Sequence, residues 1–198
     1  MQPADHPIHE IIRNRRSVKP ALMDSEREVS RELIELLLEN ANWAPNHGHT
    51  EPWRFHIYTG SVRQRLADFL PSLYKDKTAP DQFRPEKFEK LGVTPLLAPV
   101  VIMICLKRGA NPKIPLEEEM EAVACAVQNL HLTASAMGLG GFWSSPPVVY
   151  EAEMNAFLGL GKADRCLGLF YVGWPKEGEV FESSRRPIAE KTAWVDEQ

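Results

Sequence analysis

A cluster of cationic and hydroxyl side chains, NRRSVKP at positions 14–20, is the clearest candidate for chemistry in this sequence. It places Arg15, Arg16, Ser17 and Lys19 within five positions. Arginine guanidinium groups bind phosphate oxygens through paired hydrogen bonds, and a serine hydroxyl can add a further contact. The cluster predicts a site for a phosphate or a polyol phosphate, and a solvated basic helix end is the alternative.

A second group of the same residue types lies far along the chain, in SSRRP at positions 183–187. Arg185 and Arg186 follow two serines there. The formal net charge of the chain is −4, so both clusters are local features rather than parts of a basic surface. Two Ser–Arg clusters on an acidic chain would be explained if the fold brings both of them to the same bound anion.

The stretch WAPNHGHTEPWRF at positions 43–55, between an expected helix and an expected strand, holds a third set of candidates. His47 and His49 could ligate a metal. However, two histidines two positions apart, with no nearby cysteine or carboxylate triad, form a weak metal-binding pattern. We therefore predict no metal site, and interpret the stretch, with Trp43, His47 and His49, as a rigid loop that contacts a planar ligand.

A glycine-rich stretch, MGLGGFWSSPP at positions 137–147, follows an expected helix. Phosphate-binding glycine loops lie between a strand and the start of a helix, so that reasoning does not apply to this order. One interpretation is a helix C-cap with close packing. The other is a backbone that approaches a flat ring system at Gly140 and Gly141, with Trp143, Ser144 and Ser145 beside it.

The usual catalytic side chains are missing from the pattern. No serine lies in a Gly-x-Ser-x-Gly turn, and no carboxylate pair stands out. His131, on an expected long helix, is interpreted as a core or interface histidine. Cys105, Cys125 and Cys166 lie in apolar runs and are expected to be buried free thiols, which indicates a reducing compartment. An enzyme without an evident nucleophile or acid–base pair often carries its chemistry on a cofactor.

Composition limits the class of protein. With 198 residues, 43% hydrophobic and 25% charged, the chain is expected to form one globular domain over residues 1–198. Its acidic balance argues against coating nucleic acid or an anionic membrane. The first ten residues lack the apolar run of a secretory signal, and no stretch reaches the roughly 18 apolar residues of a membrane span. We expect a cytoplasmic protein.

The hydrophobic pattern predicts alternating helices and strands, and therefore an α/β or α+β layered domain. Helices are expected at 7–16, 25–44, 61–73, 117–137 and around 151–160, and strands at 53–60, 96–108 and 166–175, with a short strand or turn at 141–147. In the second helix, Ser25 and Glu28 form a capping pattern at the start and Pro45 marks the end. The run at 96–108 is apolar throughout, as in a strand buried on both faces.

Three further segments bear on the site. Residues 71–95 are charged and hold four prolines, so we expect a short helix with mobile loops that covers a site. The helix at 117–137 is rich in Ala, Val and Leu almost all round, so it is either buried or paired with its copy in a second subunit. The polar tail from 176 to 195 has too little apolar surface to fold alone and is expected to lie across another part of the structure.

Taken in order, four stretches resemble the motifs of the FMN-dependent nitroreductase family, particularly its shorter NAD(P)H-dependent members, over nearly the whole chain. RRSVK is similar to the family's Arg-x-Ser-x-Arg/Lys motif, and APNHGHTEPW to its Ala-Pro-Ser-x-x-Asn-x-Gln-Pro-Trp loop. GLGGFWSS is similar to its Gly-Leu-Gly-x-x-Trp segment. LGLFYVGWP, followed by RRP, resembles the closing strand and basic tail.

The resemblance implies an α+β fold with a central mixed or antiparallel sheet flanked by helices, in a homodimer with two FMN sites at the subunit interface. The long helix and a swapped C-terminal tail would form much of that interface. Carried over by position, Arg15, Arg16 and Ser17 would bind the FMN phosphate and ribityl chain, and Arg185 and Arg186 would complete the phosphate site. Lys19 would lie near the flavin N1/O2 edge, and Trp143, Ser144 and Ser145 would lie beside the ring, near Gly140 and Gly141. His47 and His49 would come from the loop of the partner subunit.

The implied activity is transfer of hydride from NADH or NADPH through flavin N5 to a small acceptor, such as a nitroaromatic compound or a quinone, by a ping-pong mechanism. Lys19 would support the reduced flavin, and no side chain is assigned a certain catalytic role. His49 stands where the family often has Asn, and Glu51 where it often has Gln, which leaves the acceptor open. The alternatives are a flavin reductase, a dehalogenase-like member of the family, and a non-catalytic FMN-binding protein.

Overall fold

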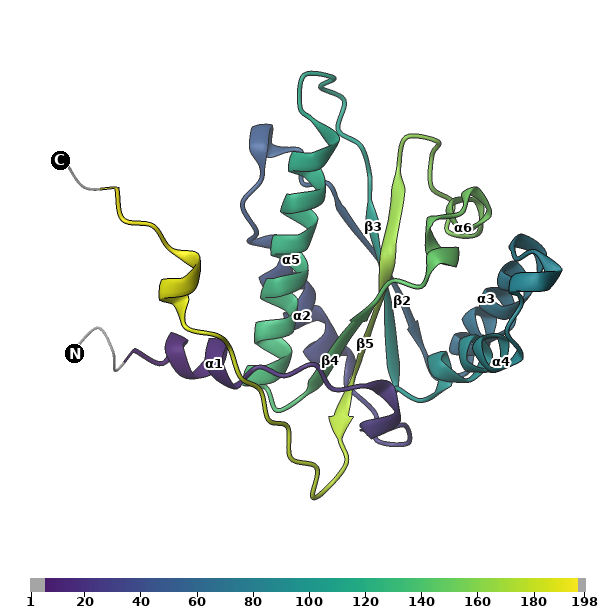
Figure 1. The fold of residues 1–198 in the computed structure, drawn as a ribbon, viewed down its shortest axis with the longest axis horizontal. Coiled ribbons are helices and arrows are strands. Elements are labelled where there is room, and N and C mark those ends of the chain that lie inside the picture. The colour runs from purple at the N-terminus through teal and green to yellow at the C-terminus, as the bar shows by residue number, and fades with distance from the viewer. Residues whose placement is uncertain (1–5, 196–198) are drawn as a thin grey trace.

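An antiparallel sheet forms the centre of the computed structural model, which describes residues 6–195 (Figure 1). Its strand order is β1–β5–β3–β2, and β4 also pairs with β5. All four pairings are antiparallel. The strands are β1 (Met23–Asp24), β2 (Trp53–Thr59), β3 (Val100–Leu106), β4 (Gly140–Ser144) and β5 (Arg165–Pro175). The predicted α+β sheet with flanking helices is confirmed.

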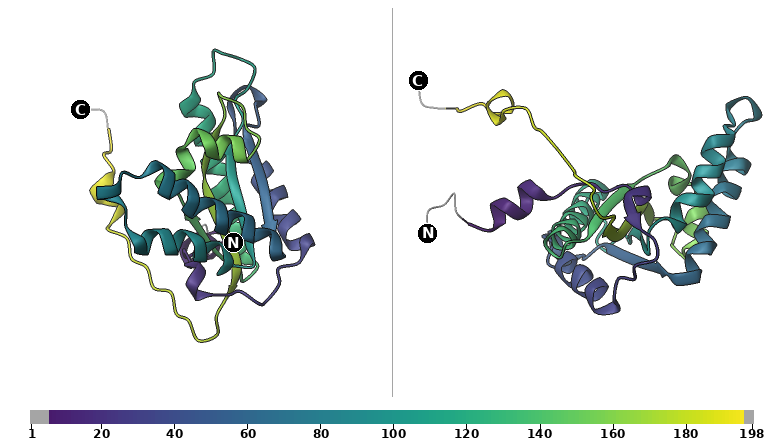
Figure 2. Two further views of the ribbon diagram at one scale, coloured as in Figure 1. Left: turned by 90° about the vertical axis from the view of Figure 1, so that its right-hand side faces the viewer. Right: turned by 90° about the horizontal axis from the view of Figure 1, so that it is seen from below.

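Helices cover both faces of the sheet, which makes three layers (Figures 1 and 2). The helices are α1 (Ile8–Asn14), α2 (Arg31–Asn42), α3 (Gln64–Lys77), α4 (Pro85–Val93), α5 (Leu116–Ala136) and α6 (Ala152–Phe157). One face packs against α2 and α5, and the other against α3, α4 and α6. Every residue of β3 is buried, as the continuous apolar run predicts for a strand with helices on both sides.

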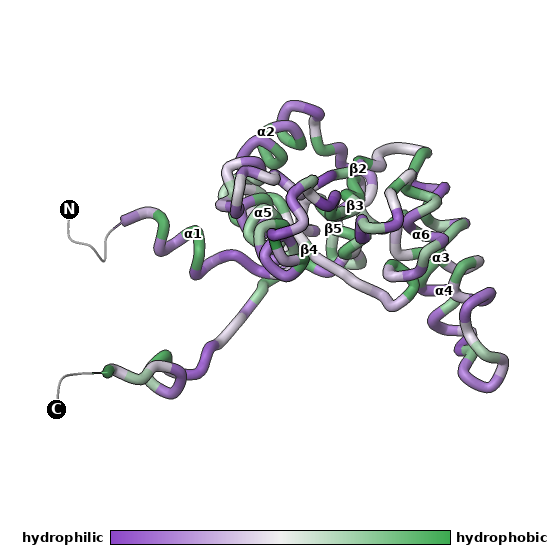
Figure 3. The backbone as a smooth tube through the Cα atoms, turned by 90° about the horizontal axis from the view of Figure 1, so that it is seen from above, coloured by the Kyte–Doolittle hydropathy of each residue, from purple (hydrophilic) through white to green (hydrophobic). Residues whose placement is uncertain are grey.

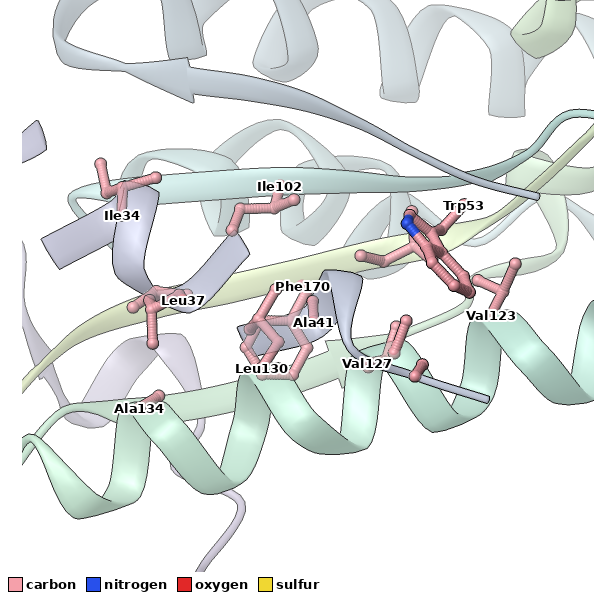
Figure 4. Close-up of a cluster of buried hydrophobic side chains, with 14 of the residues drawn as sticks. Ile34, Leu37, Ala41, Trp53, Ile102, Val123, Val127, Leu130, Ala134 and Phe170 are labelled. Carbon is pink, nitrogen blue, oxygen red and sulfur yellow. The ribbon is translucent and has the colours of Figure 1, made fainter. Parts of the chain in front are cut away.

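Alternate side chains of the sheet enter two separate cores because neighbouring residues of a strand point to opposite faces. Ile102, Phe170 and Trp53 pack against Leu37 of α2 and Leu130 of α5 in the first core, as Figure 4 shows. The second core uses the alternate positions, among them Val101, Met103, Leu169 and Tyr171. Figure 3 shows the hydrophobic residues gathered in these layers.

The helix α2 begins later than predicted. Ser30, not Ser25, is its N-cap, and the Ser30 hydroxyl accepts a hydrogen bond from the Leu33 amide at 3.3 Å. The Ser25 hydroxyl instead donates to its neighbour Glu26 at 3.2 Å, and Asp24 accepts from the amide of Glu26 at 3.0 Å. Residues 24–27 thus form a turn because a short carboxylate side chain competes successfully for the local amides.

The segment 71–95 is more helical than predicted. Helix α3 continues through Pro71 to Lys77, α4 follows from Pro85 to Val93, and 3₁₀ turns lie at Pro80–Gln82 and Thr94–Leu96. The pyrrolidine ring of Pro71 is buried, so packing offsets the hydrogen bond that proline removes from a helix. Aromatic contacts join the parts: Tyr74 stacks on Phe83 with ring centroids 5.4 Å apart.

Both terminal segments extend away from the sheet (Figure 1). The predicted helix at 7–16 is α1, whose Ile12 is 50% exposed. The tail after β5 is extended apart from a 3₁₀ turn at Ile188–Lys191, and Trp194 is 83% exposed. Both segments therefore expose large apolar side chains in one chain.

The cysteine prediction is partly wrong. Cys105 and Cys166 are buried and lie opposite each other on β3 and β5, and both are free thiols. Cys125 is also free, but it lies on the exposed face of α5. The apolar residues around Cys125 did not show which side of the helix faces the sheet. No helix within residues 6–195 is both long and apolar enough to cross a membrane.

Candidate active site

The two Ser–Arg segments, far apart in sequence, meet at one cavity of about 370 Å³. Its lining comes from the residues after α1 and from the tail after β5: Arg15, Arg16, Ser17, Val180, Phe181, Glu182, Ser183 and Arg185. The structure therefore brings together the clusters that the sequence suggested would share an anion. Arg186 does not line the cavity; it is exposed and lies 3.8 Å from Glu190.

Arg16 joins the two segments through backbone contacts. Its Nε donates to the Phe181 carbonyl at 3.0 Å, and its Nη1 donates to the carbonyls of Arg13 and Arg15 at 2.5 and 3.1 Å. Much of the Arg16 guanidinium is therefore committed to protein carbonyls. Its main role is to hold the tail against the segment that follows α1.

The charged residues of the cavity lining are three arginines, Arg15, Arg16 and Arg185, and one carboxylate, Glu182. Partial burial lowers the pKa of Arg15, and the nearby cations Arg185 and Arg16 lower that pKa further. Among residues 6–195, no carboxylate forms an ion pair with Arg15 or Arg185. Cations held close together without a paired carboxylate favour an anionic ligand, and a phosphate has the oxygens to bridge them.

The segment after α1 is extended, and its side chains alternate between the two sides. Val18 is buried, whereas Ser17 and Lys19 are exposed on the opposite side. Lys19 does not line the cavity, but it lies on the same side as Ser17, two positions further along. The pattern Arg15–Ser17–Lys19 thus forms one polar face that begins at the cavity.

Gly140 and Gly141 let this segment approach β4 closely. The Val18 amide donates to the Gly141 carbonyl at 3.0 Å, and Ser17 forms a β-bridge with Gly141. A Cβ on Gly140 would lie 2.7 Å from Val18 Cβ, and one on Gly141 would lie 2.6 Å from Phe170 Cζ. Close packing, the first of the two interpretations from sequence, therefore accounts for both glycines.

The end of β4 is tied to β5. The Trp143 indole Nε1 and the Ser145 hydroxyl both donate to the Leu167 carbonyl, at 3.1 and 3.0 Å. Gly168 has φ +129°, and a Cβ there would lie 2.5 Å from the Ser144 carbonyl oxygen. Trp143, Ser144 and Ser145 do not line the arginine cavity. The hydrogen bonds of Trp143 and Ser145 hold the end of β4 against β5.

The loop at 43–52 lies away from the arginine cavity within one chain. His47 Nδ1 lies 2.6 Å from Glu118 Oε2, near the start of α5, whereas the segment after α1 contacts α5 at His131. These two positions are 13 residues apart, which is roughly 20 Å along a helix. Trp43 is 79% exposed, and its indole donates to Glu39 at 3.1 Å. One chain therefore does not bring this loop to the arginines.

The same loop holds unusual backbone conformations. His49 and Glu51 have φ values of +52° and +42°, which side chains other than glycine rarely adopt. The Asn46 side chain accepts a hydrogen bond from the Glu51 amide at 3.0 Å and holds the turn. Strained residues of this kind gather at functional sites. No group of three or more His, Cys, Asp or Glu side chains suited to a metal occurs within residues 6–195.

Sequence reasoning missed two features of the cavity. The Phe181 backbone carbonyl accepts the hydrogen bond from Arg16, and no residue pattern marks such a contact. His131 reaches the Arg16 carbonyl from α5 at 3.1 Å, although 115 positions separate them. The sequence does place a polar residue, His131, on the buried side of a helix, which indicates that it has a hydrogen-bond partner. It does not show that this partner is the Arg16 carbonyl.

Comparison with known proteins identifies the family of this chain. The model of the Nitroreductase family matches residues 12–174. YfhC of Bacillus subtilis (strain 168), which bears the provisional name NAD(P)H nitroreductase, is 30% identical over 186 residues, 93% of this chain and 92% of YfhC.

Two solved structures share the fold at similar identity. A nitroreductase-like family protein from Bacillus cereus has a TM-score of 0.79 and 29% identity, covering 95% of each chain. A protein from Desulfovibrio desulfuricans, solved in complex with FMN and described provisionally as a nitroreductase, has a TM-score of 0.71 and 27% identity, covering 97% of this chain and 98% of its own. Since the family match spans most of its length, this chain belongs to the Nitroreductase family.

Proposed function

We propose that this protein is an FMN-dependent oxidoreductase that takes hydride from NADH or NADPH and passes it to a small acceptor, such as a nitroaromatic compound or a quinone. The cavity where Arg15 and Arg185 meet without a paired carboxylate is the observation that carries the proposal. It suits the phosphate of FMN. The FMN complex of the Desulfovibrio relative and the name of the Bacillus subtilis relative support the cofactor and the electron donor.

Each residue of the polar face has a task in this proposal. Arg15 and Arg185 bind the phosphate, and Ser17 binds the phosphate or the adjoining ribityl chain. Lys19, further along the same face, would lie near the N1/O2 edge of the bound ring, where a cation would stabilise the negative charge of the reduced flavin. Trp143, Ser144 and Ser145 form the wall of β4 near the ring.

When bound, FMN supplies at its N5 atom the hydride acceptor and donor of a ping-pong reaction. This chain positions the donor and the acceptor in turn and excludes water. The helical segment 71–95 is proposed to cover the site, within one domain over residues 1–198. The buried free thiols Cys105 and Cys166 suit a reducing compartment such as the cytoplasm.

A second copy of the chain completes the proposed site. The middle of the α5 side that faces away from the sheet exposes the uncharged residues Ala124, Cys125 and Gln128, which suit contact with a copy of the same helix, and Glu121 is exposed one turn before them. The loop with His47 and His49, distant from the arginines of its own chain, would reach the flavin of the partner. The exposed tail, which includes Trp194 and Val195, would cross to the partner as a swapped segment.

Reconstitution and turnover test the proposal. Purified protein is incubated with FMN, desalted, and assayed for bound flavin, then for oxidation of NADH and of NADPH with a nitroaromatic compound, a quinone and free flavin as acceptors. We expect one FMN per chain, reduction of the bound flavin by a nicotinamide, and a ping-pong pattern in the initial rates. Protein that retains no FMN contradicts the proposal, whereas bound FMN without turnover identifies a binding protein.

A further inference from the structure

His131 lies against the phosphate-binding segment but belongs to α5. The residue is 8% exposed, and its Nε2 is 3.1 Å from the Arg16 carbonyl oxygen. Its ring meets Phe170 edge-on, with centroids 5.2 Å apart and planes at 79°. Gly141 closes over it, since a Cβ there would lie 2.8 Å from His131 Cδ2. Packing from β5 and β4 therefore fixes the orientation of the imidazole.

The burial of His131 and its contact with the Arg16 carbonyl define the protonation state and the tautomer of the imidazole. Burial lowers the pKa of His131 to about 4, and the Arg15 cation lowers it as well, so the ring is neutral near pH 7. A carbonyl oxygen can only accept a hydrogen bond, so the Nε2 atom must carry the proton. His131 is thus a neutral donor to the Arg16 carbonyl, and the backbone of Gly141 also lies beside its ring.

That carbonyl belongs to the peptide unit between Arg16 and Ser17. The unit is trans, and in a trans peptide the C=O and the N–H point in opposite directions. Because His131 draws the Arg16 carbonyl towards α5, the Ser17 N–H points away from α5. The next amide, that of Val18, points inward to the Gly141 carbonyl. Ser17 itself lines the arginine cavity.

We propose that His131 is a positioning residue for phosphate binding: by fixing the Arg16–Ser17 peptide plane, it directs the Ser17 N–H at the anion that Arg15 and Arg185 hold. This inference rests on the proposed function. A backbone donor held in place in advance adds affinity because no ordering remains to be done on binding. His131 touches neither the cofactor nor the substrate in this role.

Matched variants separate positioning from packing. His131→Leu removes the donor and keeps an apolar side chain, whereas His131→Gln keeps an amide N–H near the place of Nε2. FMN and riboflavin, which lacks the phosphate, are titrated into full-length apoprotein of each variant. We expect His131→Leu to weaken FMN binding about tenfold or more and to leave riboflavin binding unchanged, and His131→Gln to restore FMN affinity.

His56→Leu serves as the control, because His56 is a partly buried histidine on β2, at the far side of the sheet from β4. It should bind both ligands as the wild type does. Equal losses for FMN and riboflavin in His131→Leu would show a general packing role and overturn the inference, as would unchanged FMN affinity. Wild-type protein that binds neither ligand would instead overturn the proposed function. Circular dichroism confirms that each variant is folded.

Discussion

Arg15 and Arg16 are neighbours in sequence, but their guanidinium groups have different surroundings. Arg16 donates to three backbone carbonyls, whereas Arg15 stands near Arg185 with no paired carboxylate among residues 6–195. The sequence grouped both arginines with one anion. It could not show that one of them binds the protein itself, because backbone carbonyls carry no residue-type signal.

The first prediction concerns this pair of cations. Replacing Arg15 and Arg185 together with Ala should release FMN, because each change removes a charge-assisted contact of about 1.5–3 kcal/mol. Bound flavin after desalting, measured by absorbance, checks it. Arg13→Ala is the control, since Arg13 is exposed and does not line the cavity. Retention of one FMN per chain by the double variant would contradict the phosphate assignment.

A pH prediction follows from His131. Its pKa is lowered from 6.5 to about 4 in the folded chain, whereas the unfolded chain binds the proton near pH 6.5. Between these values the unfolded state holds more protons, so stability is fully present above pH 6.5 and falls as the pH is lowered towards 4. The expected loss is about 2 kcal/mol by pH 5 and about 3 kcal/mol in all.

Urea unfolding at pH 7 and pH 5 measures this effect. Other groups titrate in the same range, so the quantity of interest is the difference between the wild type and His131→Gln. The variant should lose less stability between the two pH values, by about 2 kcal/mol. An identical loss in both proteins would mean that His131 is accessible to protons in the folded state.

At the scale of elements, the predictable features were those set by long apolar patterns. The apolar run of β3 and the 21-residue helix α5 were identified from sequence because their burial extends over many positions. Helix boundaries that depend on which of two nearby residues forms the cap could not be predicted from the sequence. Ser25 and Ser30 have equal capping chemistry, and only the turn that Asp24 holds makes Ser30 the cap. Pro71 ends no helix because tertiary packing overrides its local preference.

The close approach of β4 to its neighbours gives a third prediction. Gly141→Ala should reduce the free energy of unfolding by about 1–3 kcal/mol, because the added methyl group would overlap Phe170 and His131. Gly92→Ala in α4 is the matched control. Its Cβ would meet Ala67 O at 3.4 Å and Pro71 Cγ at 3.7 Å, which are ordinary contacts, so the change should be neutral or stabilising.

Chemical denaturation of the two glycine variants measures both effects on one scale. Equal stability of Gly141→Ala and the wild type would show that the side chains around β4 can shift to accommodate the added methyl group. In that case the packing of Phe170 and His131 against β4 would not depend on glycine at position 141.

For the whole molecule, α5 shows why assembly matters. One side of the helix packs on the sheet and α2, and the other side is exposed in one chain. The sequence left open whether the helix is buried or paired with a copy, since its apolar residues occur almost all round. One chain covers half of the helix, and the proposed dimer would cover the rest.

The fourth prediction tests that dimer. Ala124→Glu should convert the protein to a monomer, because two buried carboxylates related by symmetry would face each other without partners. Ala163→Glu is the control, since Ala163 is also exposed but lies in the loop before β5. Sedimentation equilibrium measures the mass of both variants in solution, and we expect a monomer for Ala124→Glu and a dimer for Ala163→Glu. A dimeric Ala124→Glu variant would show that the interface does not include this side of α5.

The contact between Arg16 and Phe181 spans 165 positions, and this separation has a consequence for biosynthesis. A chain emerging from the ribosome presents the first half of the anion cavity early and the second half only after residues 181–185 have been made. During most of translation the cavity cannot close, however well the sheet has folded. Capture of the anion is therefore a late event, and a chain truncated before residue 181 would fold much of its core and still lack the site.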